Sequence, residues 1–204
     1  MGVHAGVVFF DQRPIEEAGR ALVAGVKPFA PDGVSAFAHE GALLVYGARH
    51  VWASERRSHS LRQSPSGLVM TWDGRLDNRD DLCLTLGQTS SCDTSDPAIA
   101  MATFERWGVE GLGRLIGDWS LVIWDGRLRT LYLARDYMGV RPLYYHECPG
   151  RSVAWSGSLG ELALRAGCAD ALDERFVARF MALRHSTDVT PYEGIRAVPT
   201  ASCL

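Results

Sequence analysis

The 204-residue sequence lacks the features that mark several large classes of protein. No apolar run is long enough to cross a bilayer, and the apolar start GVHAGVVFF has neither a basic leader nor a cleavage site. No run of lysine and arginine is longer than the pair Arg56-Arg57, and the formal net charge is -3. A nucleic-acid surface is therefore not expected. We predict a cytoplasmic protein with neither a nucleic-acid nor a membrane partner.

The cysteines follow no ligand pattern. The chain has five cysteines, an odd number, and no two of them form a C-x-x-C pair. Neither a disulfide framework nor a zinc site is supported, and no metal site is predicted. Reduced, buried thiols are the simpler interpretation. The cysteines are Cys83, Cys92, Cys148, Cys168 and Cys203.

What the sequence does contain is the material for a packed core, because 47% of its residues are hydrophobic and 22% are charged. The length fits one domain, or one domain with a short tail. Apolar and β-branched segments predict strands over residues 3–10, 33–39, 42–47, 68–72, 119–124, 130–135, 142–146 and 152–156. Helical spacing and capping residues predict helices over 14–26, 78–86 and 96–107, and a last one that begins at Asp173.

The order of these elements favours an α+β fold with antiparallel sheets, since most neighbouring strands are joined by hairpins. Two sheets stacked face to face, with helices outside, would accommodate them. Residues 54–66 are polar and predict a loop, and the last residues predict a loop that leads into a strand. The dipeptides Asp73-Gly74 and Asp125-Gly126 are ordinary turn residues. His4, in an apolar strand, is more simply a core histidine than a base, and the tryptophans at strand positions are core residues.

Several segments resemble the amino-terminal domain of glutamine-dependent asparagine synthetases. The most specific is GDWSLVIWD followed by LYLARDYMGVRPLYY, over residues 117–145, which resembles G-x-F-A-F-x-x-W-D and then L-x-x-x-R-D-x-x-G-x-x-P-L-Y-Y. DGRLDNRDDL resembles N-G-E-I-Y-N-x-x-E-L, and TPYEGIRAVPTASCL resembles the segment that leads into the synthetase domain. The resemblance covers nearly the whole chain. It implies the four-layer αββα fold of Ntn hydrolases and class-II glutamine amidotransferases.

The resemblance also implies a chemistry that this sequence does not match at its central position. In the family, a cysteine that follows the removed initiator methionine attacks the glutamine amide, and its own α-amino group serves as the base. The family opens M-C-G-I-A-G and this chain opens M-G-V-H-A-G, so Gly2 occupies the position of the nucleophile. Because no cysteine precedes residue 83, none replaces it without processing. No catalytic residue is therefore assigned.

The other positions implied by the resemblance depart as well. Asp73 stands where an asparagine side chain donates to the oxyanion, although the partner Gly74 is kept. Arg75 replaces a glutamate that helps to hold the substrate ammonium group. The position of the arginine that binds the substrate carboxylate holds Arg49 or His50, depending on a one-residue shift. Asp96 matches a vestigial ligand, although before a proline it is equally expected as a helix cap.

We therefore expect residues 1–166 to form a degenerate amidotransferase domain that does not hydrolyse glutamine. Residues 167–204 would form a helix and tail that lead toward a synthetase domain or subunit. Relatives without the terminal cysteine include β-lactam synthetases and lasso-peptide cyclases, in which the domain serves as a scaffold. ATP and magnesium are expected only for the synthetase part, so no cofactor is assigned to this chain.

Two alternatives stay open. The domain could be an active glutaminase with an unrecognised nucleophile. It could instead be a free-standing binding module, in which Arg75 beside Asp73 and Asp96 makes a pocket suited to a zwitterion. A homo-oligomer is also possible, because an apolar face meant for a synthetase domain would be exposed. The candidate residues for that face are Tyr137, Met138, Val140 and the tail after Val189.

Overall fold

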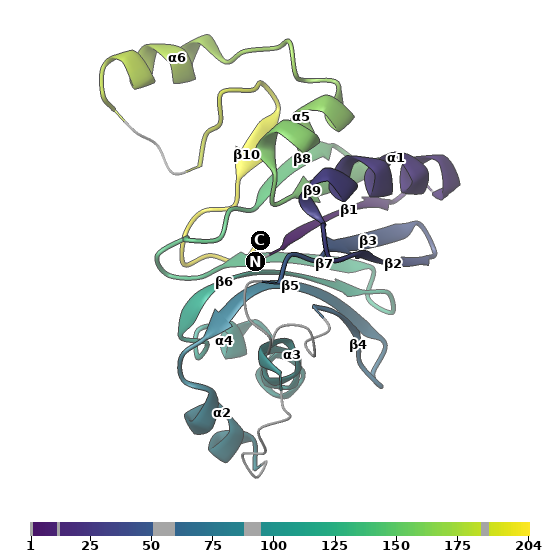
Figure 1. Cartoon of the computed structure of the whole chain (residues 1–204), viewed down its shortest axis with the longest axis vertical. Helices are drawn as coiled ribbons and strands as arrows, with labels where there is room; N and C mark the ends of the chain where they lie inside the picture. Colours follow the sequence, from purple (N-terminus) through teal and green to yellow (C-terminus); the bar gives the residue numbers. More distant parts are fainter. Residues whose placement is uncertain (1, 12, 51–59, 88–94, 185–187) are drawn as a thin grey trace.

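Two antiparallel sheets packed face to face form the centre of the molecule, with helices outside each of them (Figure 1). The structure is a computed structural model of residues 1–204, and it describes all of them except 1, 12, 51–59, 88–94 and 185–187. The prediction of an α+β, Ntn-hydrolase-like αββα sandwich with mostly antiparallel sheets is confirmed. The strand predicted over residues 3–10 is β1, which lies inside the first sheet.

The first sheet has six strands in the order β10-β8-β9-β1-β3-β2, and the second has four in the order β4-β5-β6-β7. In the first, the strands are β1 (Val3–Phe9), β2 (Val34–His39), β3 (Ala42–Gly47), β8 (Tyr144–Cys148), β9 (Ser152–Ser156) and β10 (Ile195–Ala197). In the second, they are β4 (Leu61–Gln63), β5 (Leu68–Leu76), β6 (Gly117–Asp125) and β7 (Thr130–Arg135). The inner faces of both sheets meet in one apolar core, which includes Val8, Val122 and Trp155.

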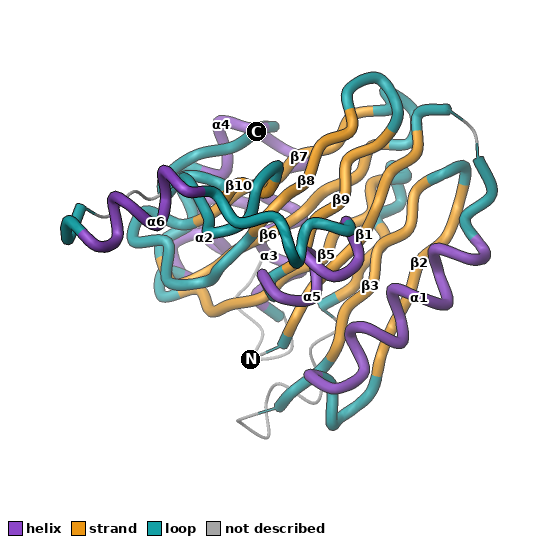
Figure 2. Tube along the Cα trace, turned by 90° about the horizontal axis from the view of Figure 1, so that it is seen from above, coloured by secondary structure: helices purple, strands orange, loops and turns teal. Residues whose placement is uncertain are grey.

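Helices cover the outer faces of both sheets (Figures 1 and 2). The first sheet is covered by α1 (Glu16–Val26), which continues into the short 3-10 helix η1 (Lys27–Phe29), and by α5 (Leu159–Ala166). The second sheet is covered by α3 (Asp96–Trp107) and α4 (Val109–Leu112), with α2 (Arg79–Leu86) beyond them. A further helix, α6 (Glu174–Met181), lies at the periphery in both views and buries none of its residues. Among the described residues, no helix is long and apolar enough to span a membrane.

Local sequence signals explain several element ends. The β6–β7 hairpin turns where the Asp125 carboxylate accepts hydrogen bonds from the backbone N–H groups of Arg127 and Leu128, at 2.9 and 3.0 Å. Helix α2 ends at Gly87, whose φ of +73° is the left-handed conformation that glycine adopts without strain. Helix α6 begins at Asp173, whose carboxylate accepts from two N–H groups of its first turn. These ends agree with the prediction.

Other local predictions were wrong. Asp73-Gly74 is no turn, because both residues lie inside β5 and pair with Ser120 and Trp119 of β6. The ladder between β5 and β6 continues through this dipeptide, and its long-range pairing outweighs the local preference for a turn. Asp96 is the first residue of α3 and not its cap, since Ser95 takes the cap position. Pro14 precedes α1 and does not lie in its first turn.

Several elements of the structure were not predicted from the sequence. Strand β4 lies in the stretch predicted as loop over 54–66, of which residues 51–59 are outside the described residues. Helices α4 and α5 were not predicted. The last residues pair with both sheets: β10 forms the edge of the first sheet, and Leu204 exchanges two backbone hydrogen bonds with Leu133 of β7. The division at residue 166 stays a prediction.

A loop after β7 owes its shape to the two charged residues that begin it. The Arg135 guanidinium donates to the carbonyl oxygens of Gly139, Arg141 and Val198. The buried Asp136 carboxylate accepts from the backbone N–H groups of Trp119, Met138 and Gly139, at 2.7 to 3.1 Å. These two charged side chains bind the backbone of the loop and so determine its shape. The shape therefore does not depend on burial of the apolar side chains in the loop, which face solvent.

Candidate functional site

The predicted nucleophile position lies at the start of β1, between the two sheets. The backbone N–H of Gly2 donates to Oδ1 of Asp73 at 2.8 Å, and Asp73 is only 6% exposed. Asp73 is on the face of β5 that points toward the first sheet, since Trp72 and Leu76 belong to the core on the opposite face. The structure therefore brings together two of the residues predicted from the sequence, Gly2 and Asp73.

The space where a side chain of residue 2 would stand is already filled. A Cβ built on Gly2 would overlap the hydroxyl and the ring of Tyr46, and it would lie 2.6 Å from the carbonyl oxygen of Gly47. Tyr46 belongs to β3, which pairs with β1 beside this point. The tyrosine is the end of a flexible side chain, but the carbonyl belongs to a central strand and cannot move cheaply. Glycine fits this position better than any larger residue.

Asp73 also meets a cation that the sequence analysis did not assign. Nη1 of Arg141 lies 3.9 Å from Oδ2 of Asp73, and the arginine side chain is 16% exposed. Arg141 is held in place by the loop after β7, whose backbone Arg135 binds. No local signal marks either Tyr46 or Arg141, because each reaches the site from an element distant in sequence. The G-x-x-P segment that contains Arg141 was recognised only as a motif.

Next to Asp73, a buried polar cluster joins the two sheets. Nε2 of His4 lies 3.0 Å from the hydroxyl of Ser120, and Nδ1 lies 3.2 Å from the hydroxyl of Thr71. All three side chains are buried. Burial lowers the pKa of His4 to about 4, although the negative charge of Asp73 works in the opposite direction. His4 is thus neutral at physiological pH and is a core histidine with hydrogen-bond partners, as predicted.

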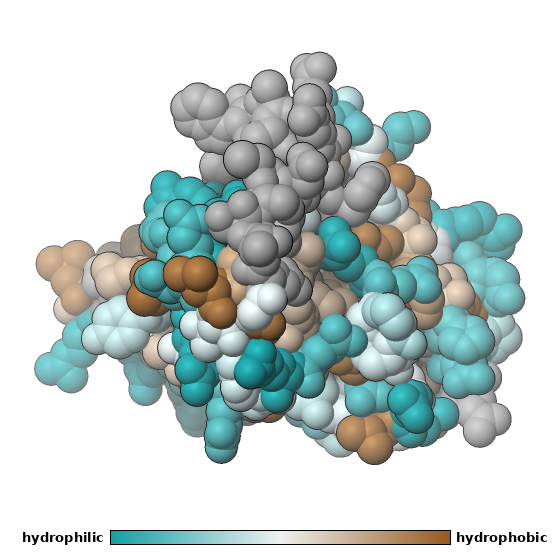
Figure 3. All heavy atoms as spheres, turned by 90° about the horizontal axis from the view of Figure 1, so that it is seen from below, coloured by the Kyte–Doolittle hydropathy of each residue, from teal (hydrophilic) through white to brown (hydrophobic). Residues whose placement is uncertain are grey.

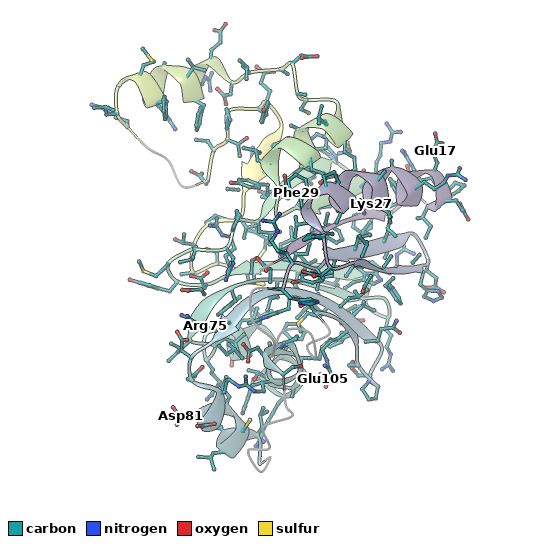
Figure 4. All side chains as sticks on the ribbon, in the orientation of Figure 1. Glu17, Lys27, Phe29, Arg75, Asp81 and Glu105 are labelled. Carbon is teal, nitrogen blue, oxygen red and sulfur yellow. The ribbon has the colours of Figure 1, made fainter. Side chains whose placement is uncertain are left out.

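Arg75 forms ion pairs with carboxylates other than Asp73, and the predicted pocket of Arg75, Asp73 and Asp96 stays a prediction. Its side chain is 62% exposed and forms ion pairs with Asp77 at 2.8 Å and Asp118 at 3.3 Å. Figure 4 shows Arg75 at the rim of the second sheet, with its side chain directed outward. Because the side chain is exposed and its partners are Asp77, directly after β5, and Asp118 of β6, solvent screens these pairs and they contribute little to stability.

Asp96 is also engaged by neighbouring groups. Its Oδ2 accepts from the backbone N–H of Leu76 at 3.0 Å, and its Oδ1 lies 3.0 Å from Nη1 of Arg79. Burial raises the pKa of Asp96, while the hydrogen bond from Leu76 and the charge of Arg79 oppose the increase. The carboxylate thus ties the beginning of α3 to the end of β5. Hydrogen bonding to a strand explains its position without a ligand.

Gly74 is required by a close approach of two backbones. A Cβ on Gly74 would overlap the carbonyl oxygen of Asp118 and would lie 2.6 Å from the Cα of Trp119. Its φ of +153° is also uncommon for residues with a side chain. The glycine that the resemblance places in an oxyanion hole is therefore also needed by the β5–β6 ladder.

Arg49 and His50 follow β3, on the side where β1 begins, because Gly47 pairs with Val3. Arg49 is exposed, and the backbone N–H of His50 donates to the carboxylate of Asp32 at 2.7 Å. The residues that continue from here, 51–59, lie outside the described part of the chain. Within that described part, no group of three or more His, Cys, Asp or Glu side chains is placed to hold a metal ion.

A glutamine amidotransferase domain model matches residues 26–204, which is most of the chain. The chain belongs to this family. The match begins after β1, so Gly2 lies outside it. A Mycobacterium tuberculosis protein that bears the name asparagine synthetase [glutamine-hydrolyzing] is 28% identical over 141 residues, which are 66% of this chain and 22% of that protein.

A second relative has a similar name. Asparagine synthetase [glutamine-hydrolyzing] 2 of Bacillus subtilis is 31% identical over 87 residues, or 43% of this chain and 12% of that protein. The amidotransferase domain thus spans about a fifth or less of the length of these relatives. Among solved structures, the glutamine phosphoribosylpyrophosphate amidotransferase of B. subtilis has a TM-score of 0.60 at 15% identity, covering 81% of this chain and 44% of that one. This likeness supports the fold alone.

Proposed function

We propose that this amidotransferase-like domain of the asparagine synthetase family does not hydrolyse glutamine. The observation that carries the proposal is the environment of Gly2. Glycine has no side chain to act as a nucleophile, and the volume that one would need is filled by Tyr46 and by the carbonyl oxygen of Gly47. An active glutaminase would need a nucleophile from elsewhere, and the buried hydroxyl of Ser120 offers none to a substrate.

The base and the oxyanion site are also unfavourable for glutamine hydrolysis. The Gly2 nitrogen, which would be the α-amino group after removal of Met1, donates to Asp73. A positively charged amine paired with a carboxylate holds its proton more tightly, so it is a poorer base. Where the resemblance places an oxyanion donor, this chain has a carboxylate, which would repel the developing negative charge. The nucleophile, the base and the oxyanion donor would therefore all be impaired around Gly2 and Asp73.

We propose that the domain acts as a scaffold within a larger ATP-dependent, amide-forming protein. The relatives are several times longer than this chain, and the bulk of each lies outside the matched part. The loop that Arg135 and Asp136 shape exposes Tyr137, Met138 and Val140, which suits contact with a further domain or subunit. ATP and magnesium would bind that other part. Members without the terminal cysteine, such as β-lactam synthetases and lasso-peptide cyclases, need no ammonia from glutamine.

The alternative of a zwitterion-binding pocket receives less support. Its three charged residues each have a partner within the protein: Asp73 has Gly2 and Arg141, Arg75 has two aspartates, and Asp96 has Arg79. A zwitterionic ligand would have to displace these interactions to bind.

The test is glutamate release from glutamine by the purified protein, followed with an enzyme-coupled assay. An active class-II amidotransferase serves as the positive control, and heat-unfolded protein serves as the blank. We expect no release above the blank. Release at about 1 s⁻¹ or faster, which is ordinary for an enzyme, would show that the domain is an active glutaminase and would reject the proposal.

A further inference from the structure

A cysteine and a histidine lie side by side on the outer face of the first sheet, away from the site around Gly2. His146 and Cys148 are two residues apart on β8, so their side chains share one face of the strand. This is the face covered by α5, because Tyr144 packs with Leu162 of that helix. The Cys148 sulfur lies 3.4 Å from Nε2 of His146, and both residues are partly exposed.

The hydrogen bond at the other ring nitrogen decides which atom of His146 can act as a base. Nδ1 lies 2.9 Å from the carbonyl oxygen of Gly194. A carbonyl oxygen only accepts, so Nδ1 must donate, and Nε2 of the neutral ring carries the lone pair. That lone pair faces the thiol. Gly194 directly precedes β10, which pairs with β8 through Ile195 and His146, so the carbonyl that orients the ring is fixed to the same sheet.

Cys148 has a base beside it that a carbonyl group orients. The Nε2 lone pair of His146 faces the sulfur, and the carbonyl oxygen of Gly194 holds the ring through Nδ1. A base positioned beside a thiol in this way is the arrangement that activates nucleophilic cysteines.

We propose that Cys148, with His146 as its base, is a reactive thiol and a site of modification by peroxides and other small electrophiles. The thiol proton moves to Nε2 of His146. The thiolate then attacks one oxygen of a peroxide, the O–O bond breaks, and the leaving hydroxide takes the proton from the imidazolium to become water. Sulfur is oxidised by two electrons to a sulfenic acid and hydrogen peroxide is reduced. With an alkyl halide, a C–S bond forms and halide leaves.

The same chain supplies matched controls. Cys168 is partly exposed like Cys148, but its sulfur contacts only the carbonyl oxygen of Ala166 among the hydrogen-bonding groups of the described residues. Cys203 is partly exposed too, but burial raises its pKa, which disfavours the thiolate. Cys83 is buried. The proposal therefore ranks Cys148 first among the four cysteines that the structure describes.

The experiment is brief labelling of the folded protein with limiting iodoacetamide at neutral pH, followed by peptide mass spectrometry of each cysteine. Because the thiolate is the reacting form and His146 is placed to take the thiol proton of Cys148, we expect Cys148 to react about tenfold faster than Cys168. In a parallel sample treated with hydrogen peroxide, a 1,3-dione probe should label Cys148 first. Equal labelling of Cys148 and Cys168 would overturn the proposal.

The variant His146→Asn isolates the role of the imidazole. Asparagine keeps a donor near the position of Nδ1, so it can still bind the carbonyl oxygen of Gly194, but it removes the base at Nε2. We expect the rate at Cys148 to fall to that of Cys168, with the rate at Cys168 unchanged. An undiminished rate at Cys148 in this variant would also overturn the proposal. If the variant does not fold, the ratio measured in the wild-type protein decides alone.

Discussion

Placing a cysteine at residue 2 tests the proposal that this domain does not hydrolyse glutamine. Replacing Gly2 by cysteine, with Met1 removed, would return both the thiol and its own α-amino base. The new Cβ would nevertheless overlap the Tyr46 side chain and approach the carbonyl oxygen of Gly47 to 2.6 Å. Forcing extra atoms into a packed site typically costs about 1–3 kcal/mol. At about 2–4 °C per kcal/mol for a chain of this size, the melting temperature should fall by roughly 5 °C.

The catalytic consequence is larger than the loss of stability. Loss of one oxyanion donor typically lowers turnover by about 10²–10³-fold, and the carboxylate of Asp73 adds repulsion to that loss. We therefore expect Gly2→Cys alone to show no measurable glutaminase activity. The triple variant Gly2→Cys, Asp73→Asn, Arg75→Glu restores the three residues that the family resemblance implies. The structure adds Tyr46→Ala to the minimum set, because the tyrosine still occupies the space of the new thiol.

The assay is glutamate release from glutamine by each variant, with melting temperatures recorded in parallel. The matched control is Gly2→Ser with the same substitutions, which has a similar shape but a poorer nucleophile. If Gly2→Cys alone turned over glutamine at about 1–10³ s⁻¹, the placement of Gly2 against Tyr46 and Asp73 would be incorrect. An unchanged melting temperature would show that the local packing around residue 2 yields easily.

Three other outcomes are expected. The pKa of His4 is depressed in the folded protein, so between pH 6.5 and 4 the unfolded chain binds a proton that the folded one does not, and stability should fall by about 3 kcal/mol as the pH falls through this window. Urea titrations of His4→Gln should lack this loss, and an equal loss would contradict it. Arg135→Met leaves three carbonyl groups without their donor and should lower stability by about 3–5 kcal/mol in urea unfolding, whereas a change below about 1 kcal/mol would refute the role given to Arg135. The isolated chain should self-associate through exposed apolar residues such as Met138 and Phe180, and sedimentation should show less association when both are changed to serine; a monomer at high concentration would count against this.

The apolar surface expected for self-association differs in one part from the one predicted from the sequence. The tail after Val189 was predicted to be exposed, but Ile195, Ala197 and Val198 are buried, because β10 completes the first sheet. Exposed apolar residues include those predicted in the loop after β7 and others on α6, where Phe180 stacks on Phe176. In Figure 3, which views the molecule from the side of α2 and α3, hydrophobic and hydrophilic residues are interspersed on the described surface.

The fold was largely predictable because its signals are local. The hairpin of β6 and β7 combines two apolar segments with an aspartate whose side chain makes the turn, so a short window contains all the information. Asp73-Gly74 shows the limit of such windows. The same dipeptide type lies inside a strand there, since pairing with Trp119 and Ser120, more than forty positions along the chain, determines its conformation.

The candidate site was predictable only in part, for the same reason. Gly2 and Asp73 were assigned from a motif, and the structure brings them into contact. The motif gives no information about the groups that fill or neutralise the site from other elements. Tyr46 reaches it from β3, and Arg141 reaches it from the loop after β7. The ion-pair partners of Arg75 were not predicted, because alternation along a strand shows which side a residue is on, but not which partners lie there.

These contacts are consistent with the proposal that the fold is kept without glutamine hydrolysis. The residues of the strongest motif, Arg135, Asp136 and Gly139, bind or accommodate backbone groups, so they hold the sheet and the loop together whether or not glutamine is bound. Asp73, at the proposed oxyanion position, has likewise become part of the packing, since it connects the start of β1 to β5. Reversing one substitution would then break an existing interaction before it restored a catalytic one. Several coupled changes are required, which is why the variants above must be combined.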